Sequence, residues 1–119
     1  MQCHFRAAEY PIDSTIATKD WIVAHDRLGR TLSYSLKTGK CTGKVFGTPI
    51  SISAQNNSVL IEHGEGRLGL YDLQNMREIE ELVFSYPVSH VAFSRDGQKL
   101  IAVTTDEMVY VLGPNGVKN

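Results

Sequence analysis

An internal repeat constrains the fold of this chain more than any other feature of its sequence. A shift by 41 positions superposes apolar residues on apolar residues: Val59, Leu60, Leu68 and Leu70 fall on Leu100, Ile101, Val109 and Val111. A shift by 37 positions superposes matching segments, namely residues 29–30 on 66–67 and residues 34–36 on 71–73. A period of this length indicates stacked units of one supersecondary design. We therefore expect about three units of roughly 40 residues each.

Each unit has the pattern of several short β-strands. In the third unit, Asp96-Gly97 separates the apolar runs at residues 89–94 and 99–105, which is a strong hairpin signal. The continuous apolar segments WIVA, VLI and LIAV, one in each unit, are typical of strands covered on both faces. The repeat therefore predicts an all-β fold with antiparallel strands in each unit.

The segments at residues 40–47 and 77–86 join the units, and we expect each to form a fourth, outermost strand. The second segment also fits a short helix, because its apolar residues share one helical face and glutamate favours helix over strand. We favour a strand, because the equivalent first segment contains Gly43 and makes a poor helix.

Composition excludes several functional classes. The hydrophobic fraction of 42% and charged fraction of 21% are ordinary for a globular protein, and the net charge of −1 without a basic cluster argues against nucleic acid as a ligand. The N-terminus has no cationic start before an apolar run, and no run of about 18 apolar residues would span a membrane. We expect a cytoplasmic protein with Cys3 and Cys41 reduced, a bridge between them being the alternative.

No motif in the sequence specifies catalysis or metal binding. The four histidines lack partners at ligand spacing, and there is no GxSxG nucleophile elbow. Glu78, Glu80 and Glu81 fit the solvated face of an outer strand better than paired catalytic carboxylates, and residues 64–69 lack the lysine and helix of a phosphate loop. Trp21 fits core packing better than a surface hot spot. We expect no catalytic residue, no metal and no cofactor.

The units resemble the blades of the WD-repeat β-propeller family. Tyr71-Asp72 stands where the family has Trp-Asp at the end of the third strand, with weaker counterparts at residues 34–35 and 112–113. Residues 37–40 are similar to the turn after that strand, and residues 91–103 are similar to the family's first hairpin. The resemblance implies a β-propeller-like arc of about three four-stranded antiparallel blades.

The sequence departs from the family at the buried polar network. The Gly-His dipeptide that commonly precedes the first strand is replaced by residues 47–49 and 85–87. Asp106 stands at the place of the family's Asp before the third strand, and His90 is the nearest candidate partner for it.

We expect the chain to form a single domain with an N-terminal extension. The predicted parts are an extra strand or arm at residues 1–10, blades at residues 11–47 and 48–86, and a last blade at residues 87–119 that lacks its outer strand. Because propellers close with about four to eight blades, three blades leave apolar faces open. We therefore expect the arc to be completed either by self-association, in which two arcs form a six-bladed ring, or by a partner chain. Residues 2–8 are the candidate for the outer strand that the last blade lacks.

The turns between second and third strands share one rim of a propeller with the links into the first strands. The predicted partner-binding residues on this rim are His25, Asp26, Arg27, Pro49, His63, Glu65, Tyr86, Pro87, Asp106 and Glu107. Mixed charge with tyrosine and histidine suits a protein or peptide partner. The sequence predicts a non-enzymatic protein–protein interaction scaffold; the alternative is a propeller enzyme or metal-dependent subunit with a pocket in the assembled central channel.

Overall fold

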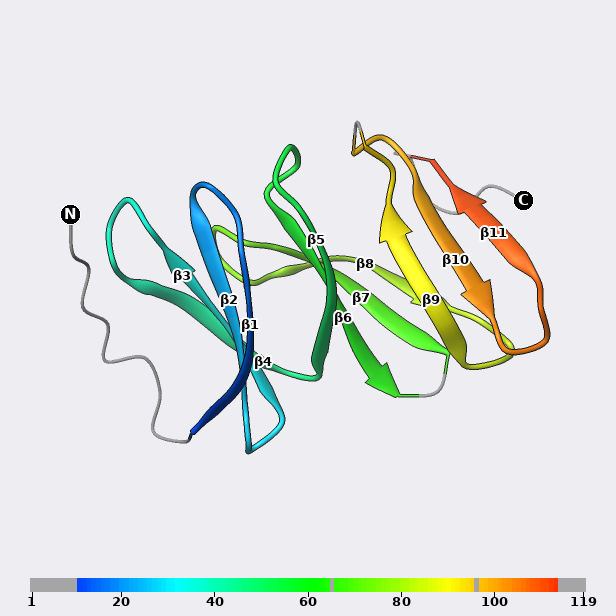
Figure 1. Cartoon of the computed structure of the whole chain (residues 1–119), viewed down its shortest axis with the longest axis horizontal. Helices are drawn as coiled ribbons and strands as arrows, with labels where there is room; N and C mark the ends of the chain where they lie inside the picture. The colour runs from blue at the N-terminus through cyan, green and yellow to red at the C-terminus, as the bar shows by residue number, and fades with distance from the viewer. Residues whose placement is uncertain (1–10, 65, 96, 114–119) are drawn as a thin grey trace.

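Three antiparallel β-sheets stand side by side in chain order in the computed structural model, which describes residues 11–64, 66–95 and 97–113 (Figure 1). The first sheet contains β1 (Ile12–Ala17), β2 (Trp21–Asp26), β3 (Arg30–Ser35) and β4 (Cys41–Phe46). The second contains β5 (Thr48–Ser53), β6 (Ser58–Gly64), β7 (Arg67–Asp72) and β8 (Glu78–Val83). The third contains β9 (Val88–Phe93), β10 (Leu100–Thr104) and β11 (Val109–Leu112). No helix occurs in these ranges, and the all-β fold is confirmed.

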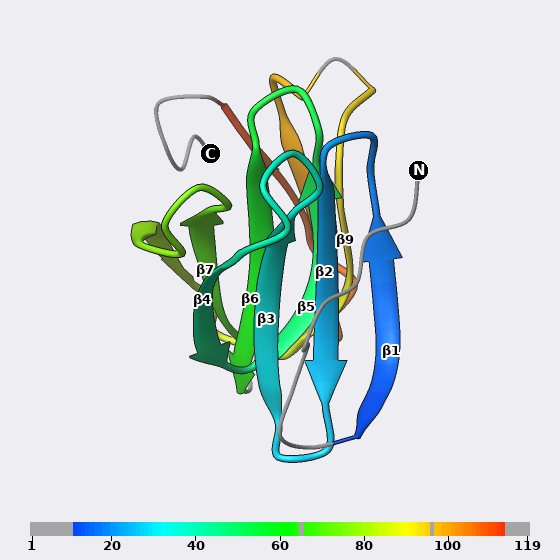
Figure 2. The same ribbon diagram turned by 90° about the vertical axis from the view of Figure 1, so that its left-hand side faces the viewer.

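Within every sheet, strands that follow one another in the chain are hydrogen-bonded neighbours. Figure 2 looks onto the first sheet, with the second sheet stacked behind it. Four parts of the chain lie outside the described residues: the predicted arm at residues 1–10, Glu65, Asp96 of the predicted hairpin, and residues 114–119.

The ambiguous segment before the third sheet is a strand. β8 pairs with β7 from Arg67 opposite Val83 to Tyr71 opposite Glu78, so its backbone groups are satisfied by a ladder. Leu82 points into the core and is buried, while Glu81 beside it is exposed and pairs with Arg67 at 3.0 Å. Tertiary pairing outweighs the helical preference of the glutamates here.

Two apolar cores hold the three sheets together. Between the first and second sheets the buried side chains are Trp21, Val23, Val59, Ile61, Tyr71, Leu73 and Met76. Between the second and third sheets they are Leu60, Leu68, Leu82, Leu100 and Leu112. Successive side chains of β6 therefore enter opposite cores, since neighbouring residues of a strand point to opposite faces. This double burial explains the continuous apolar run of β6.

Trp21 lies in the first core and is only 8% exposed, as its predicted packing role requires. Its indole Nε1 donates a hydrogen bond to Asn57 Oδ1 at 3.1 Å, which links β2 to the turn before β6. A buried indole is satisfied in this way without giving up its apolar contacts.

Glycines appear where the backbone requires them. Gly29 and Gly66 precede β3 and β7 with φ of 91° and 73°, a left-handed conformation that favours glycine. This geometry accounts for the repeated Gly-Arg dipeptide. Gly43 of β4 lies so close to the second sheet that a Cβ atom there would meet Met76 Cβ at 2.6 Å.

We expect Leu60→Ala to lower the free energy of unfolding by about 2–5 kcal/mol, because it empties part of the core between the second and third sheets. Ile79→Ala is the matched control, since Ile79 is 56% exposed on β8 and its truncation should change stability by less than about 0.5 kcal/mol. Urea unfolding followed by circular dichroism measures both values. Equal losses in the two variants would contradict the assignment of this core.

Candidate functional site

The predicted rim is present as one edge of the three sheets, drawn at the bottom of Figure 1. Each turn between second and third strands is hydrogen-bonded to a neighbouring link: Gly47 N donates to Gly29 O at 2.8 Å, Phe84 N to Gly66 O at 2.7 Å, and Thr105 N to Pro87 O at 2.9 Å. The turns and links thus form a continuous backbone-braced edge. We call this edge the rim.

The structure places the predicted rim residues in different environments. Those with exposed side chains are Arg27, His63, Tyr86, Asp106 and Glu107. Those that are half-buried are His25, Pro49 and Pro87, while Asp26 is fully buried and Glu65 lies outside the described residues. Partner binding by these residues stays a prediction.

Asp26 organises the turn between β2 and β3. Its carboxylate accepts hydrogen bonds from Leu28 N at 3.1 Å, Arg30 N at 2.9 Å and Arg30 Nε at 2.9 Å. Burial acts to raise the pKa of Asp26, but these hydrogen bonds and the Arg30 charge hold the pKa below its ordinary value. The ionised carboxylate therefore fixes the turn that presents Arg27.

Two histidines of the rim are held by short contacts. His25 Nδ1 lies 2.8 Å from Asp13 Oδ1 on β1, and His63 Nε2 lies 2.7 Å from the Tyr71 hydroxyl. The pKa of Tyr71 is raised, first by burial and then by the nearby Glu78 carboxylate. Each contact ties one imidazole to a side chain of a neighbouring strand.

In the third sheet, Asp106 is paired within its own turn. Its carboxylate accepts a short hydrogen bond from the Thr104 hydroxyl. His90, the nearest candidate from the sequence, is exposed on β9 and lies opposite Val103 in the ladder. The hydrogen-bond partner of Asp106 is therefore Thr104, which lies two residues before it in the same turn.

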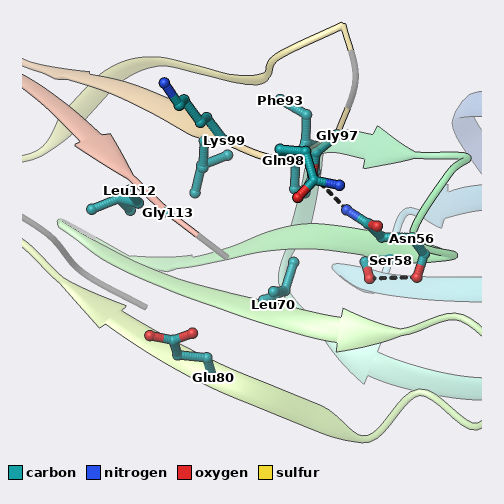
Figure 3. Close-up of a pocket in the computed structure, with 11 residues that line it drawn as sticks. Asn56, Ser58, Leu70, Glu80, Phe93, Gly97, Gln98, Lys99, Leu112 and Gly113 are labelled. Carbon is teal, nitrogen blue, oxygen red and sulfur yellow. Dashed lines mark hydrogen bonds between the residues drawn. The ribbon is translucent and has the colours of Figure 1, made fainter. Parts of the chain in front are cut away.

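A groove that the sequence did not predict lies at the opposite edge, between the second and third sheets (Figure 3). Its volume is about 220 Å³, and Leu70, Phe93 and Leu112 form apolar parts of its wall. Glu80 and Lys99 add charges of opposite sign. The signal was present in the repeat, because the shift by 41 positions superposes one groove turn, residues 56–58, on the other, residues 97–99.

The two turns beside this groove are joined. Asn56 Nδ2 donates a hydrogen bond to Gly97 O at 2.6 Å (Figure 3). A second cavity of about 240 Å³ lies between β5 and β9, and its described lining includes Ser51, Ser53 and Arg95. Hydroxyl and guanidinium groups of this kind suit hydrogen bonding to a peptide or another chain.

The described ranges contain no cluster of three or more His, Cys, Asp or Glu side chains able to hold a metal ion. Cys41 is an exposed free thiol, while Cys3, its alternative partner, lies outside the described residues. Across residues 11–64, 66–95 and 97–113, no helix has the length and apolar character needed to cross a membrane.

Comparison with solved structures identifies the fold. The chain is similar to U3-55K (15% identity, TM-score 0.70, covering 97% of this chain and 40% of that one) and to the RRP9 WD40 repeats (15%, 0.71, 97% and 39%). It is also similar to BamB from Moraxella catarrhalis (12%, 0.69, 89% and 33%). No family model and no curated protein matches the sequence. The chain thus has the fold of WD-repeat β-propeller blades, and it spans about two fifths of the first two structures.

We expect Asp26→Asn to lower the free energy of unfolding at pH 7 by about 1–3 kcal/mol, because the ionised carboxylate accepts several hydrogen bonds. Because the folded-state pKa of Asp26 lies below its ordinary value of 3.8, its contribution is present above that value and is lost as pH falls through the folded-state pKa. The difference between wild type and variant should therefore shrink in acid.

Urea unfolding at pH 7 and at a series of lower pH values measures this difference. Glu107→Gln is the control, because it removes a carboxylate from an exposed turn. A pH-independent difference between wild type and Asp26→Asn would contradict the assigned role.

Proposed function

We propose that this chain is a non-enzymatic scaffold module of WD-like blades that binds protein or peptide partners in the cytoplasm. The observation that carries the proposal is the rim, where turns from all three sheets are braced into one edge by backbone hydrogen bonds. Function carried by loops on a rigid β-scaffold is the usual arrangement. The likeness to WD40-repeat structures supports this use of the fold.

The exposed rim side chains have the chemistry of a protein-binding surface. Arg27 and Tyr86 are of the residue types that most often supply binding energy at interfaces, and Asp106 and Glu107 add opposite charge. Asp26 and the Arg30 guanidinium beside it preorganise the first turn, which lowers the cost of ordering it on binding.

The proposal includes completion of the arc by self-association or by a partner chain. The structures of U3-55K and of the RRP9 WD40 repeats extend well beyond the 40% and 39% that this chain covers, which supports the view that three sheets supply a part of such a ring. Apolar side chains at the end of the last sheet support the same view, since soluble proteins seldom expose such faces. Self-association remains the form that we expect.

We expect the double variant Arg27→Ala/Tyr86→Ala to lose at least about tenfold of its partner binding, because it removes two interface anchors from the rim. Affinity capture with purified wild-type protein, followed by quantitative mass spectrometry, identifies proteins retained at fixed stoichiometry. Binding of each retained protein is then remeasured with both purified components.

Lys37→Ala/Lys40→Ala is the matched control, because it also truncates two exposed side chains but lies on the turn between β3 and β4 at the opposite edge. Equal binding by wild type, rim variant and control would contradict the rim as the partner site.

A further inference from the structure

The groove between the second and third sheets lies where the repeat changes from tryptophan to serine. The shift by 37 positions superposes Trp21, the first residue of β2, on Ser58, the first residue of β6. The strand register agrees, because Trp21 lies opposite Ser35 and Ser58 lies opposite Asp72, each the last residue of its third strand. Trp21 and Ser58 therefore hold equivalent places in neighbouring sheets.

The surroundings of these two places correspond as well. Trp21 shares the first core with three cross-strand neighbours of the second sheet: Ile52, Val59 and Tyr71. The shift by 41 positions superposes these three on cross-strand neighbours of the third sheet, all of which line the groove: Phe93, Leu100 and Leu112. The wall that faces an indole between the first two sheets therefore faces the small side chain of Ser58 between the next two.

The groove has the size of a site for one side chain. Two of its wall residues are larger than their counterparts in the first core, yet about 220 Å³ remains open. This volume lies below the roughly 300–1,000 Å³ of small-molecule sites, so it suits a single large side chain. A carboxamide stands beside it as in the first core, because Asn57, which binds the Trp21 indole, is superposed on Gln98 of the groove.

A carboxylate gives the groove a charge that the first core lacks. The register of β3 on β4 and of β7 on β8 places Glu80 at the counterpart of Gly43. Gly43 leaves room for the apolar Met76, whereas Glu80 brings a half-buried carboxylate to the groove. Among the described residues this carboxylate has no ion-pair partner, and the Lys99 amine points away from it in Figure 3. A cationic side chain is therefore complementary to this wall.

We propose that the groove binds a tryptophan side chain of a partner protein, with a basic residue two positions away in the same extended segment. The indole takes the place that Trp21 has in the first core, and the cation pairs with Glu80. Residues two apart in an extended chain point to the same side, so one segment can supply both groups. Tryptophan is among the residue types that carry most of the binding energy at interfaces.

The chain itself cannot supply this side chain. Trp21 is its single tryptophan, is 8% exposed and is bonded to Asn57 within the first core. A second copy would have to open that core to donate its indole, so the occupant is a different protein. The groove lies at the edge opposite the rim, so this inference goes beyond the proposed function and does not depend on it.

The first test titrates the whole chain with the peptide acetyl-Ser-Trp-Gly-Lys-Ser-amide in a calorimeter. We expect binding, and a loss of at least about tenfold when the tryptophan of the peptide is replaced by alanine, because the anchor is removed. Amide shifts in proton–nitrogen correlation spectra should cluster at Asn56, Leu70 and Leu112 of the groove. No binding by wild type, or equal binding of the two peptides, overturns the proposal.

Restoring the missing tryptophan tests the place of the indole. Ser58→Trp should weaken peptide binding by at least about tenfold, because its own indole fills the groove. Urea unfolding shows whether the variant is folded. Leu70→Trp, from the half-buried wall of the groove, is a second blocking variant. A folded blocking variant that binds the peptide as tightly as wild type overturns the proposal.

Removing the charge tests the pairing with Glu80. Glu80→Gln should weaken peptide binding about twofold to fivefold, because the cation loses its partner. Glu81→Gln is the matched control, since the next residue of β8 points to the other face of the strand. Equal affinity of Glu80→Gln and wild type overturns the pairing. Arg27→Ala/Tyr86→Ala should bind the peptide as wild type does, which keeps failure of the groove and failure of the rim distinguishable.

Discussion

The structure depends on apolar contact between neighbouring sheets. Each sheet is thin, and β6 illustrates the consequence: Val59 and Ile61 enter one core while Leu60 enters the other. Hydrogen bonds within a sheet set its register, but burial between sheets supplies the driving force for their stacking. A unit of this kind is stable only beside its neighbours, which is why its sequence repeats.

The same dependence explains what the sequence predicted well. The continuous apolar runs of β6 and β10 and the Gly-Arg dipeptides are local signals, and they correspond to strands and to the turns before β3 and β7 in the structure. The strand at residues 78–83 was ambiguous locally, and its pairing with β7 resolved it. Fold class was predictable because every unit carries the pattern independently.

The site was less predictable, because side-chain partners cross between elements. Asp26 is of a residue type that usually lies on the surface, yet it is fully buried, and its carboxylate accepts hydrogen bonds from Arg30. Asp106 pairs with Thr104, a choice set by turn geometry. The groove between the second and third sheets arises from two turns far apart in sequence, and only their equivalence in the repeat indicates it. Residue type alone did not separate structural from exposed carboxylates.

The position of Trp21 gives the molecule an internal reporter. It is the single tryptophan of the chain, and its indole lies at the boundary between the first two sheets, bonded to Asn57. Its fluorescence is therefore expected to report the parting of those two sheets, because Trp21 belongs to the core between them. Since stacked units are coupled only through their interfaces, emission and backbone ellipticity will coincide during unfolding only if both interfaces fail together. The difference between the midpoints of the two unfolding transitions therefore measures how cooperatively the three sheets unfold.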